Sequence, residues 1–443
     1  MRRTAVAFRC RTASKVISRA PAARNGKHAL TEHSNPQQEP SAQSFAALRH
    51  PVFRAYFITS ALAMMADSIE HVISYWIMFQ KFHSPALGGF AVVSHWLPFL
   101  LFSVYSGALD DRFDPRRIIQ LGMLFFIAAS LGWGFLFITD ALEMWHAMVL
   151  LVIHGIAGVL WGPASQLLIH DIVGPDRLQS AVRLSATARM LGILMGPAVG
   201  GGLMLALGPA YGILANALIY LPLVHWLWRA PFKPRAAAHA APAVRGLADI
   251  AAAIRGIAGN RTIVSMTLLA GGASLFVGNA YQAQMPEFAH DLGHGDSDIS
   301  YSMLLAADAA GALIAGFVLE SRGLLQARPK TAFVLAMLWC LAIGGFAAAS
   351  SYPLALALLF TAGFLQLSFA SMAQTLVQLH APVHIRGRVI GLYSMSSLGL
   401  RAFAGVTVGL MGSLVGIHWS LALSATALLA IIIGLLGFTL RTR

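Results

Sequence analysis

Side chains that can bind a proton are rare inside the long apolar stretches of this chain. The few that occur there are the first candidates for function. Asp67 is followed three and four positions later by Glu70 and His71, so a helix would carry all three on one face. Asp308 and His154 lie in other apolar stretches. Because ionisable groups are costly to bury in hydrocarbon, we predict that these five residues bind and release protons. A structural ion pair is the alternative for Asp67, and simple packing is the alternative for His154.

Arg189 and Arg401 are the deep cations of the apolar stretches. A buried charge needs a partner of opposite sign, and Asp67, in the same half of the chain as Arg189, is one plausible partner. Either arginine would otherwise attract an anionic substrate. His95 joins them as a candidate for the substrate cavity because its imidazole titrates near neutral pH. A lone histidine on an apolar face is, however, more often a packing residue.

The sequence offers no metal site and no cofactor site. His290 and His294 are spaced four apart among acidic residues, but a solvated acidic loop explains this composition and no third ligand is evident. The two cysteines, Cys10 and Cys340, form neither a disulfide framework nor a metal-binding pair. A phosphate-binding loop of the Gly-x-x-x-x-Gly-Lys type does not occur, so we expect that ATP does not drive this protein directly.

The composition indicates that the elements positioning these residues lie in a lipid bilayer. The chain of 443 residues is 57% hydrophobic and 11% charged, whereas a soluble domain carries roughly 25% charged residues. Its mean hydropathy is +0.68, which excludes a typical soluble enzyme. An apolar helix crosses the hydrocarbon core with about 20 residues. The sequence predicts an all-α membrane protein with twelve such helices, at about 53–80, 86–109, 117–139, 143–168, 178–207, 210–229, 261–285, 298–320, 329–350, 352–379, 385–412 and 415–440.

The basic residues predict which side of the membrane each loop faces. Of the 31 lysines and arginines, 28 fall on one side of this twelve-helix arrangement, together with both termini. Cytoplasmic loops carry such an excess, so we expect an integral multi-pass protein of the bacterial cytoplasmic (inner) membrane with both termini in the cytoplasm. The net charge of +13 is thus explained by topology and needs no nucleic-acid partner.

Internal similarity divides the chain into two halves. Shifting the sequence by 209 residues aligns Gly107 with Gly316, Asp111 with Glu320 and Arg177 with Arg386. One shift that serves separated regions indicates two related bundles, and such repeats place a substrate site at their interface near mid-membrane. We predict four parts: a disordered cytoplasmic tail over 1–44, six-helix bundles over 45–229 and 259–443, and a cytoplasmic linker over 230–258.

The loop between the second and third predicted helices, Gly107-Ala-Leu-Asp-Asp-Arg-Phe-Asp-Pro-Arg-Arg117, resembles the loop signature of the major facilitator superfamily. The resemblance implies that Gly107 allows close helix packing and that Asp111 faces a helix N-terminus or an arginine. It also implies that the basic residues hold a cytoplasmic gate. The alternative is that these basic residues only fix topology. The gate candidates are Gly107, Asp111, Arg112, Arg116, Arg177 and Arg386.

The fifth predicted helix contains the run Gly192-Ile-Leu-Met-Gly-Pro-Ala-Val-Gly-Gly201, which is similar to the antiporter motif of drug/proton exporters in the same superfamily. Glycines spaced by four allow close helix contact, and a proline removes one backbone donor and bends the helix. An ordinary packing seam of small residues is the alternative. The residues of this antiporter-like motif are Gly192, Gly196, Pro197, Gly200 and Gly201.

Further segments, including Trp161-Gly-Pro-Ala and Ile385-Arg-Gly-Arg, are similar to the superfamily branch that contains the enterobactin exporter and macrolide efflux proteins. This resemblance implies two pseudo-symmetric six-helix bundles and a monomeric secondary active transporter, not an enzyme. Its expected activity is efflux of a small amphipathic drug or siderophore-like molecule in exchange for protons. Import of a small, possibly anionic metabolite, a non-transporting receptor and a lipid flippase remain alternatives. The fourth helix carries His154 where many drug/proton antiporters carry an arginine.

Overall fold

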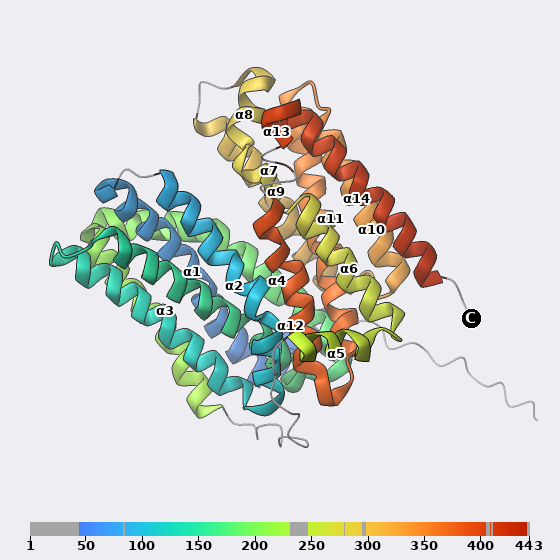
Figure 1. Ribbon diagram of the computed structural model, residues 1–443, viewed down its shortest axis with the longest axis horizontal. Coiled ribbons are helices and arrows are strands. Elements are labelled where there is room, and N and C mark those ends of the chain that lie inside the picture. Colours follow the sequence, from blue (N-terminus) through green and yellow to red (C-terminus); the bar gives the residue numbers. More distant parts are fainter. Residues whose placement is uncertain are drawn as a thin grey trace, which may run out of the picture. The chain divides into compact units, whose positions relative to one another are not determined.

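Helices are the regular elements of the described chain, and this computed structural model contains no strand among the residues described (Figure 1). The structure describes residues 44–82, 85–230, 247–278, 280–294, 298–404, 408 and 411–440. Most of the predicted tail, and residues 231–246 of the predicted linker, lie outside these ranges. The described part of the linker forms helix α5, Leu247–Ile257.

The first half folds into α1 (Pro51–Phe82), α2 (Pro85–Arg112), α3 (Pro115–Ile138) and α4 (Met144–Arg229). Within α4 the backbone leaves helical geometry at Gly174 and Gly208, whose φ angles are 68° and 76°. Glycine reaches this left-handed region without the steric cost that a Cβ adds. The two glycines therefore divide α4 into three helical stretches, 144–173, 175–207 and 209–229, which correspond to the fourth, fifth and sixth predicted helices.

The second half repeats this pattern with more interruptions. The predicted seventh and eleventh helices are each broken into shorter pieces, and at Gly278 the chain turns with a φ of 50°. The eleventh continues from α12 through the short helix η4 toward α13. The elements are α6 (Arg261–Phe276), α7 (Ala280–Ala283), α8 (Met285–Ala289), α9 (Asp298–Ser321), α10 (Pro329–Ala347), α11 (Tyr352–His380), α12 (Arg386–Ser397), η4 (Gly399–Phe403), α13 (Met411–Val415) and α14 (Ile417–Leu440).

Seven described helices are long and apolar enough by themselves to cross a membrane, with α4 counted once. When the three stretches of α4 are counted separately and the pieces of each broken helix in the second half are counted as one, the structure agrees with the predicted fold of about twelve helices. Large apolar side chains on the outer faces, such as Phe135, Leu205 and Trp228, are 64%, 92% and 71% exposed. Such faces suit contact with lipid tails.

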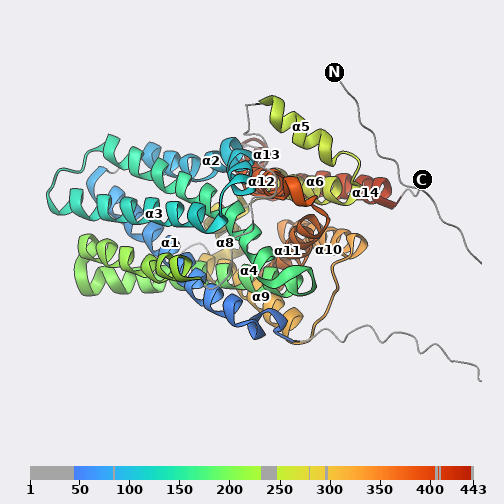
Figure 2. The same ribbon diagram turned by 90° about the horizontal axis from the view of Figure 1, so that it is seen from below.

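Packing within each half produces its own buried core. In the first half α1 and α3 both pack on α4, and the ring of Phe126 stacks on that of Tyr220 at a centroid distance of 5.3 Å. In the second half α11 packs against α9 and α10, and Trp339 contacts Phe369. Seen from below, α3 lies on one side and α10 and α14 on the other, with α12 beside α2 (Figure 2).

A short connection joins α3 to α4 at residues 139–143. There Lys81 Nζ, at the end of α1, lies 2.5 Å from Asp140 Oδ1. This hydrogen bond and the lysine charge hold the pKa of Asp140 below its usual value. Because Asp140 is exposed, the pair fixes the local geometry of the connection and adds little to stability.

Candidate functional site

A buried imidazole links two carboxylates in the first half of the chain. His154, in the first stretch of α4, places Nδ1 2.9 Å from Glu70 Oε1 and Nε2 3.1 Å from Asp67 Oδ1. Glu70 is 1% exposed and His154 is 5% exposed. Asp67 and Glu70 lie one turn apart on α1, so the single histidine between them ties α1 to α4.

Neutral polar side chains complete the surroundings of Glu70. Its second oxygen, Oε2, accepts a hydrogen bond from Ser130 Oγ of α3 at 2.7 Å and one from the Tyr220 hydroxyl at 3.4 Å. Asn216 lies next to them and donates to the carbonyl of Ala66 at 3.0 Å. Three helices thus hold a carboxylate that would otherwise be too costly to bury. Sequence reasoning missed Ser130, Asn216 and Tyr220, because neutral polar residues carry no charge signal.

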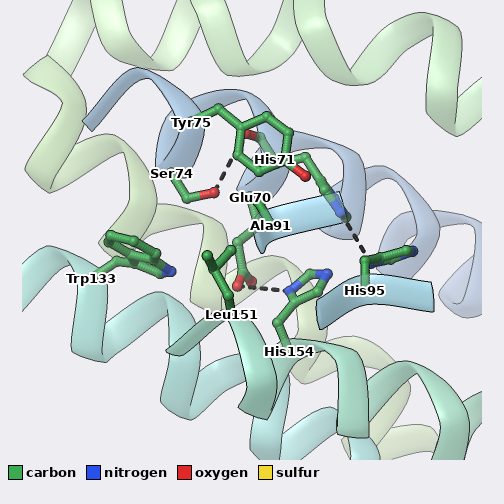
Figure 3. Close-up of a pocket in the computed structure, with 9 residues that line it drawn as sticks. All are labelled: Glu70, His71, Ser74, Tyr75, Ala91, His95, Trp133, Leu151 and His154. Atoms are coloured by element: carbon green, nitrogen blue, oxygen red, sulfur yellow. Dashed lines mark hydrogen bonds and ion pairs between the residues drawn. The ribbon is translucent and has the colours of Figure 1, made fainter. Parts of the chain in front are cut away.

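Two further histidines extend the cluster toward a small pocket (Figure 3). His71 Nδ1 donates to the carbonyl of Asp67 at 2.7 Å, and His71 Nε2 lies 3.3 Å from Nδ1 of His95 in α2. The His71 ring contacts the His154 ring edge-on, with centroids 4.6 Å apart. The structure therefore brings Asp67, Glu70, His71 and His154 together as one cluster and adds His95, which the sequence had placed with the substrate cavity.

The suggested pairing of Arg189 with Asp67 is not formed among the described residues, where the ion-pair partner of Asp67 is His154. Arg189 lies in the second stretch of α4 with an exposed side chain. Arg401 of η4 places its guanidinium 5.0 Å from the ring centroid of Trp96. The Nε atom of Arg401 has no hydrogen-bond partner within the described chain. A cation held on an aromatic face with an unused donor can bind an anion.

Asp308 is the buried carboxylate of α9, with an exposed fraction of 6%. Its Oδ2 accepts hydrogen bonds from the Tyr281 hydroxyl at 3.1 Å and from Gln282 Nε2 at 3.2 Å. Its Oδ1 has no partner among the described residues. Unlike Asp67, Asp308 has only neutral hydrogen-bond partners, so the two predicted carboxylates occupy different environments.

Asp111 joins the end of α2 to the start of α12 in the other half of the chain. Its carboxylate accepts hydrogen bonds from the backbone N–H of Gly387 at 2.6 Å and of Arg388 at 3.1 Å. A carboxylate at a helix N-terminus is favoured by the unpaired N–H groups and the helix dipole. A Cβ added at Gly107 would collide with the Gly387 carbonyl, so close backbone approach requires glycine there. We call this arrangement the Asp111 contact.

The other gate candidates have different surroundings. Arg386 donates to His170 Nδ1 at 3.1 Å. This bond links α12 to α4, in addition to the link between α12 and α2 made by Asp111. Arg116 pairs with Asp114 at 2.6 Å within the same loop. Arg112 and Arg177 are exposed.

A second contact, between α4 and the end of α9, mirrors the first. Ser180 donates to the Glu320 carboxylate, and Arg183 donates to the carbonyls of Leu319 at 3.1 Å and Leu324 at 2.6 Å. The internal shift of 209 residues had aligned Asp111 with Glu320, so a signal for this Glu320 contact was present. Arg183 could not be singled out from the sequence, where it looks like one of many loop cations.

The antiporter-like motif packs on α1, the helix that carries Asp67, Glu70 and His71. A Cβ at Gly192 would lie 3.2 Å from Met64, and one at Gly196 would collide with Ser68. Around Gly200 the nearest atom would be 3.5 Å away, an ordinary contact, and Gly201 faces open space. The side chain of Pro197 lies outside the described part of the structure.

The outer loop joins His290 and His418 through Asp291. His290 Nδ1 lies 3.4 Å from Asp291 Oδ1, and Asp291 Oδ2 lies 3.2 Å from His418 Nε2. The side chain of His294 lies outside the described residues.

Comparison with known proteins shows which family the chain resembles. A family model described as transmembrane secretion effector matches residues 42–443. The enterobactin exporter EntS of Shigella boydii is 25% identical over 376 residues, which cover 82% of this chain and 86% of that protein.

Solved structures show the same fold at low sequence identity. The human organic anion transporter MFSD10 superposes with a TM-score of 0.70 at 16% identity, covering 87% of this chain and 98% of that one. The Escherichia coli fucose:proton symporter FucP superposes with a TM-score of 0.69 at 11% identity, covering 90% and 100%. The chain therefore belongs to the transmembrane secretion effector family of the major facilitator superfamily, and it is a multi-pass membrane transporter, not an enzyme.

Proposed function

We propose that this transporter exports a small amphipathic molecule, such as a drug or a siderophore-like compound, in exchange for protons. The similarity to an enterobactin exporter over most of the chain supports export. The observation that carries proton coupling is the buried cluster of Asp67, Glu70 and His154. It lies beside the α1–α4 packing seam, where helix movement would change its contacts.

Charge balance indicates which group in the cluster exchanges the proton. With both ring nitrogens facing carboxylates, His154 carries one positive charge against two negative charges. A further proton on Asp67 would cancel the remaining charge and ease movement of the cluster through a low-dielectric region. The Asp67 side chain is 27% exposed whereas that of Glu70 is 2% exposed. Asp67 is therefore the better site of exchange, and Glu70 is the fixed anchor.

The second candidate function is transport of an anion, by import or export. It rests on Arg401, whose Nε is unpartnered among the described residues and whose guanidinium lies on Trp96. Flux measurements in proteoliposomes with an imposed pH gradient test both functions. We expect amphipathic substrates to cross the membrane in the direction opposite to the flow of protons. Flow of substrate and protons in the same direction would identify an importer.

The Asp111 contact and the Glu320 contact each join the two halves of the chain, and both lie on the side that we propose is cytoplasmic. There they act as the gate. Replacing Asp111 by alanine should open that gate, because it removes two charge-assisted hydrogen bonds at the start of α12. Losing a helix cap of this kind costs about 1–2 kcal/mol, which is roughly a tenfold change in an equilibrium. A cysteine at Gln166, which bonds Gln378 and Ser394 across the bundles, should then be labelled about tenfold faster from the cytoplasmic side.

Asp114→Ala is the matched control, because Asp114 caps α3 within its own half. We expect this variant to label at the wild-type rate. Equal labelling of the Asp111 and Asp114 variants would remove the gate assignment.

The proposed topology places both termini in the cytoplasm of a bacterial cell. Single cysteines at the exposed positions Ala141 and Gln326, in a background without Cys10 and Cys340, should react from opposite sides of the membrane. An impermeant maleimide applied to intact cells should modify the Ala141 variant, and the Gln326 variant should react only after permeabilisation. Modification of both variants in intact cells would refute this orientation.

A further inference from the structure

Three histidines from three different segments converge on the pocket of the first half. His71 comes from α1, His95 from α2 and His154 from α4 (Figure 3). One ring nitrogen from each lies within 4.8 Å of the other two. Imidazole nitrogen is a preferred ligand of divalent transition metals such as zinc, nickel and iron, whereas magnesium and calcium prefer oxygen.

The outward hydrogen bonds of His71 and His154 leave one nitrogen of each ring available on the side where the three histidines meet. A carbonyl can only accept, so His71 Nδ1 must carry the proton that it donates to Asp67 O, and in the neutral ring Nε2 is left as an acceptor. In the same way His154 Nδ1 donates to Glu70, which leaves Nε2 facing Asp67 Oδ1 at 3.1 Å. That Nε2 is buried, and its geometry toward Asp67 Oδ1 is not that of a regular hydrogen bond.

His71 Nε2 and His95 Nδ1 lie 3.3 Å apart, so a proton or a metal ion must lie between them. A neutral His95 with its proton on Nδ1 satisfies this one contact, whereas one metal ion can bind a nitrogen of all three rings. The outer bonds of His71 and His154 to a carbonyl and a carboxylate are the kind that orient histidines around metals and set their tautomers. For zinc–nitrogen bonds of about 2.05 Å, a tetrahedron has edges of about 3.3 Å. The separation between His71 Nε2 and His95 Nδ1 is 3.3 Å, and Asp67 Oδ1 supplies a fourth donor atom nearby.

We propose that His71, His95 and His154, together with Asp67, form a binding site for one divalent transition-metal ion of the zinc class. This site goes beyond the proposed transport function, although it uses the same cluster. It requires the form in which His154 Nε2 and Asp67 carry no proton, so a metal ion and the protons of the export cycle are alternative occupants. The site also departs from the expectation drawn from sequence, in which no metal site was evident. The three histidines are 24 and 59 residues apart in the chain, so their spacing matches no local metal motif.

Metal content of the full-length transporter tests the proposal directly. The protein is purified in lipid nanodiscs with an affinity tag that contains no histidine, incubated with Zn²⁺ or Co²⁺, and freed of unbound metal by gel filtration. We expect about one tightly bound ion per chain, with the intense visible bands of four-coordinate Co²⁺. An excess of Mg²⁺ should not displace the ion.

Variants locate the ion. His95→Ala is the main test, because His95 is partly exposed and its removal leaves the buried Glu70–His154 pair in place. It should lose the bound ion and the Co²⁺ bands. Glu70→Gln changes the residue that accepts the hydrogen bond of His154 Nδ1. It should weaken binding of the metal ion about 10–100-fold. His225→Ala, at an exposed histidine of α4, is the matched control and should bind like wild type.

Two results would overturn the assignment. One is a wild-type protein that binds no Zn²⁺ or Co²⁺ after gel filtration. The other is a His95→Ala variant that retains the ion and its bands. Because binding is measured without a pH gradient or a transported molecule, failure here leaves the export proposal standing, and failure of the flux assay leaves this site standing.

Discussion

Replacing Asp67 by asparagine is expected to abolish transport driven by a pH gradient while leaving the chain folded and inserted. Asparagine keeps the size of the side chain and an oxygen that can face His154 Nε2, which lies 3.1 Å away in the wild type. It cannot exchange a proton. Each pH unit of gradient supplies about 1.4 kcal/mol per exchanged proton. Losing one exchanged proton should therefore lower the attainable substrate ratio about tenfold for every pH unit applied.

The other buried carboxylates provide the comparisons for this result. Asp308→Asn should have a weaker or substrate-selective effect, because Asp308 interacts with Tyr281 and Gln282 and has no cationic partner among the described residues. Glu70→Gln is a poorer test of coupling, since Glu70 is almost fully buried and its replacement also disturbs Ser130. Substrate counterflow without a gradient serves as the control, and Asp67→Asn should retain it.

One outcome would exclude both aspartates from coupling. If Asp67→Asn and Asp308→Asn kept full gradient-driven flux, singly and combined, protons would have to move through His95 or His154, or export would not use protons at all. A loss of counterflow as well as gradient-driven flux would indicate instead that Asp67 is needed for the conformational cycle.

The spans of most helices could be predicted because a bilayer demands long apolar runs. The fourth and fifth predicted helices end close to Gly174 and Gly208, where the α4 backbone leaves helical geometry. The interruptions of the seventh and eleventh helices could not be predicted. Both segments are apolar on average, despite Gln282 after the break at Gly278 and Arg401 in η4. Hydropathy averaged over a span does not distinguish a continuous helix from a broken one.

Which residues belong to the charged cluster could be predicted more readily than which of them contact one another. Helical spacing placed Asp67, Glu70 and His71 on one face, and the structure brings all three to the cluster. Arg189, the suggested cation, does not form an ion pair with Asp67 among the described residues, because His154 lies at that carboxylate. The charges of Arg189 and Asp67 still attract each other. The residues Asp67 and His154 are 87 positions apart. Their contact depends on how α1 packs on α4, which a single sequence does not reveal.

Replacing Gly196 by leucine is expected to abolish transport without preventing membrane insertion. The second stretch of α4 packs so closely on α1 that even a Cβ at Gly196 would collide with Ser68. Small residues of this kind let two membrane helices approach, and a large side chain forces them apart. Asp67 precedes Ser68 directly, so the displacement would also move a carboxylate away from His154. Overpacking of this kind costs about 1–3 kcal/mol, which the inserted bundle should tolerate.

Gly201→Leu is the matched control, because Gly201 belongs to the same motif and has open space where a side chain would lie. It should transport at the wild-type rate, and Gly200→Ala, whose added Cβ would make ordinary contacts at 3.5 Å, should also remain active. In this order, the size of the effect depends on how closely each glycine approaches α1, and not on whether it belongs to the motif. Equal loss of flux in the Gly196 and Gly201 variants would mean that the glycines act through helix flexibility. Normal flux in Gly196→Leu would mean that close packing of α1 on α4 is not required for the transport cycle.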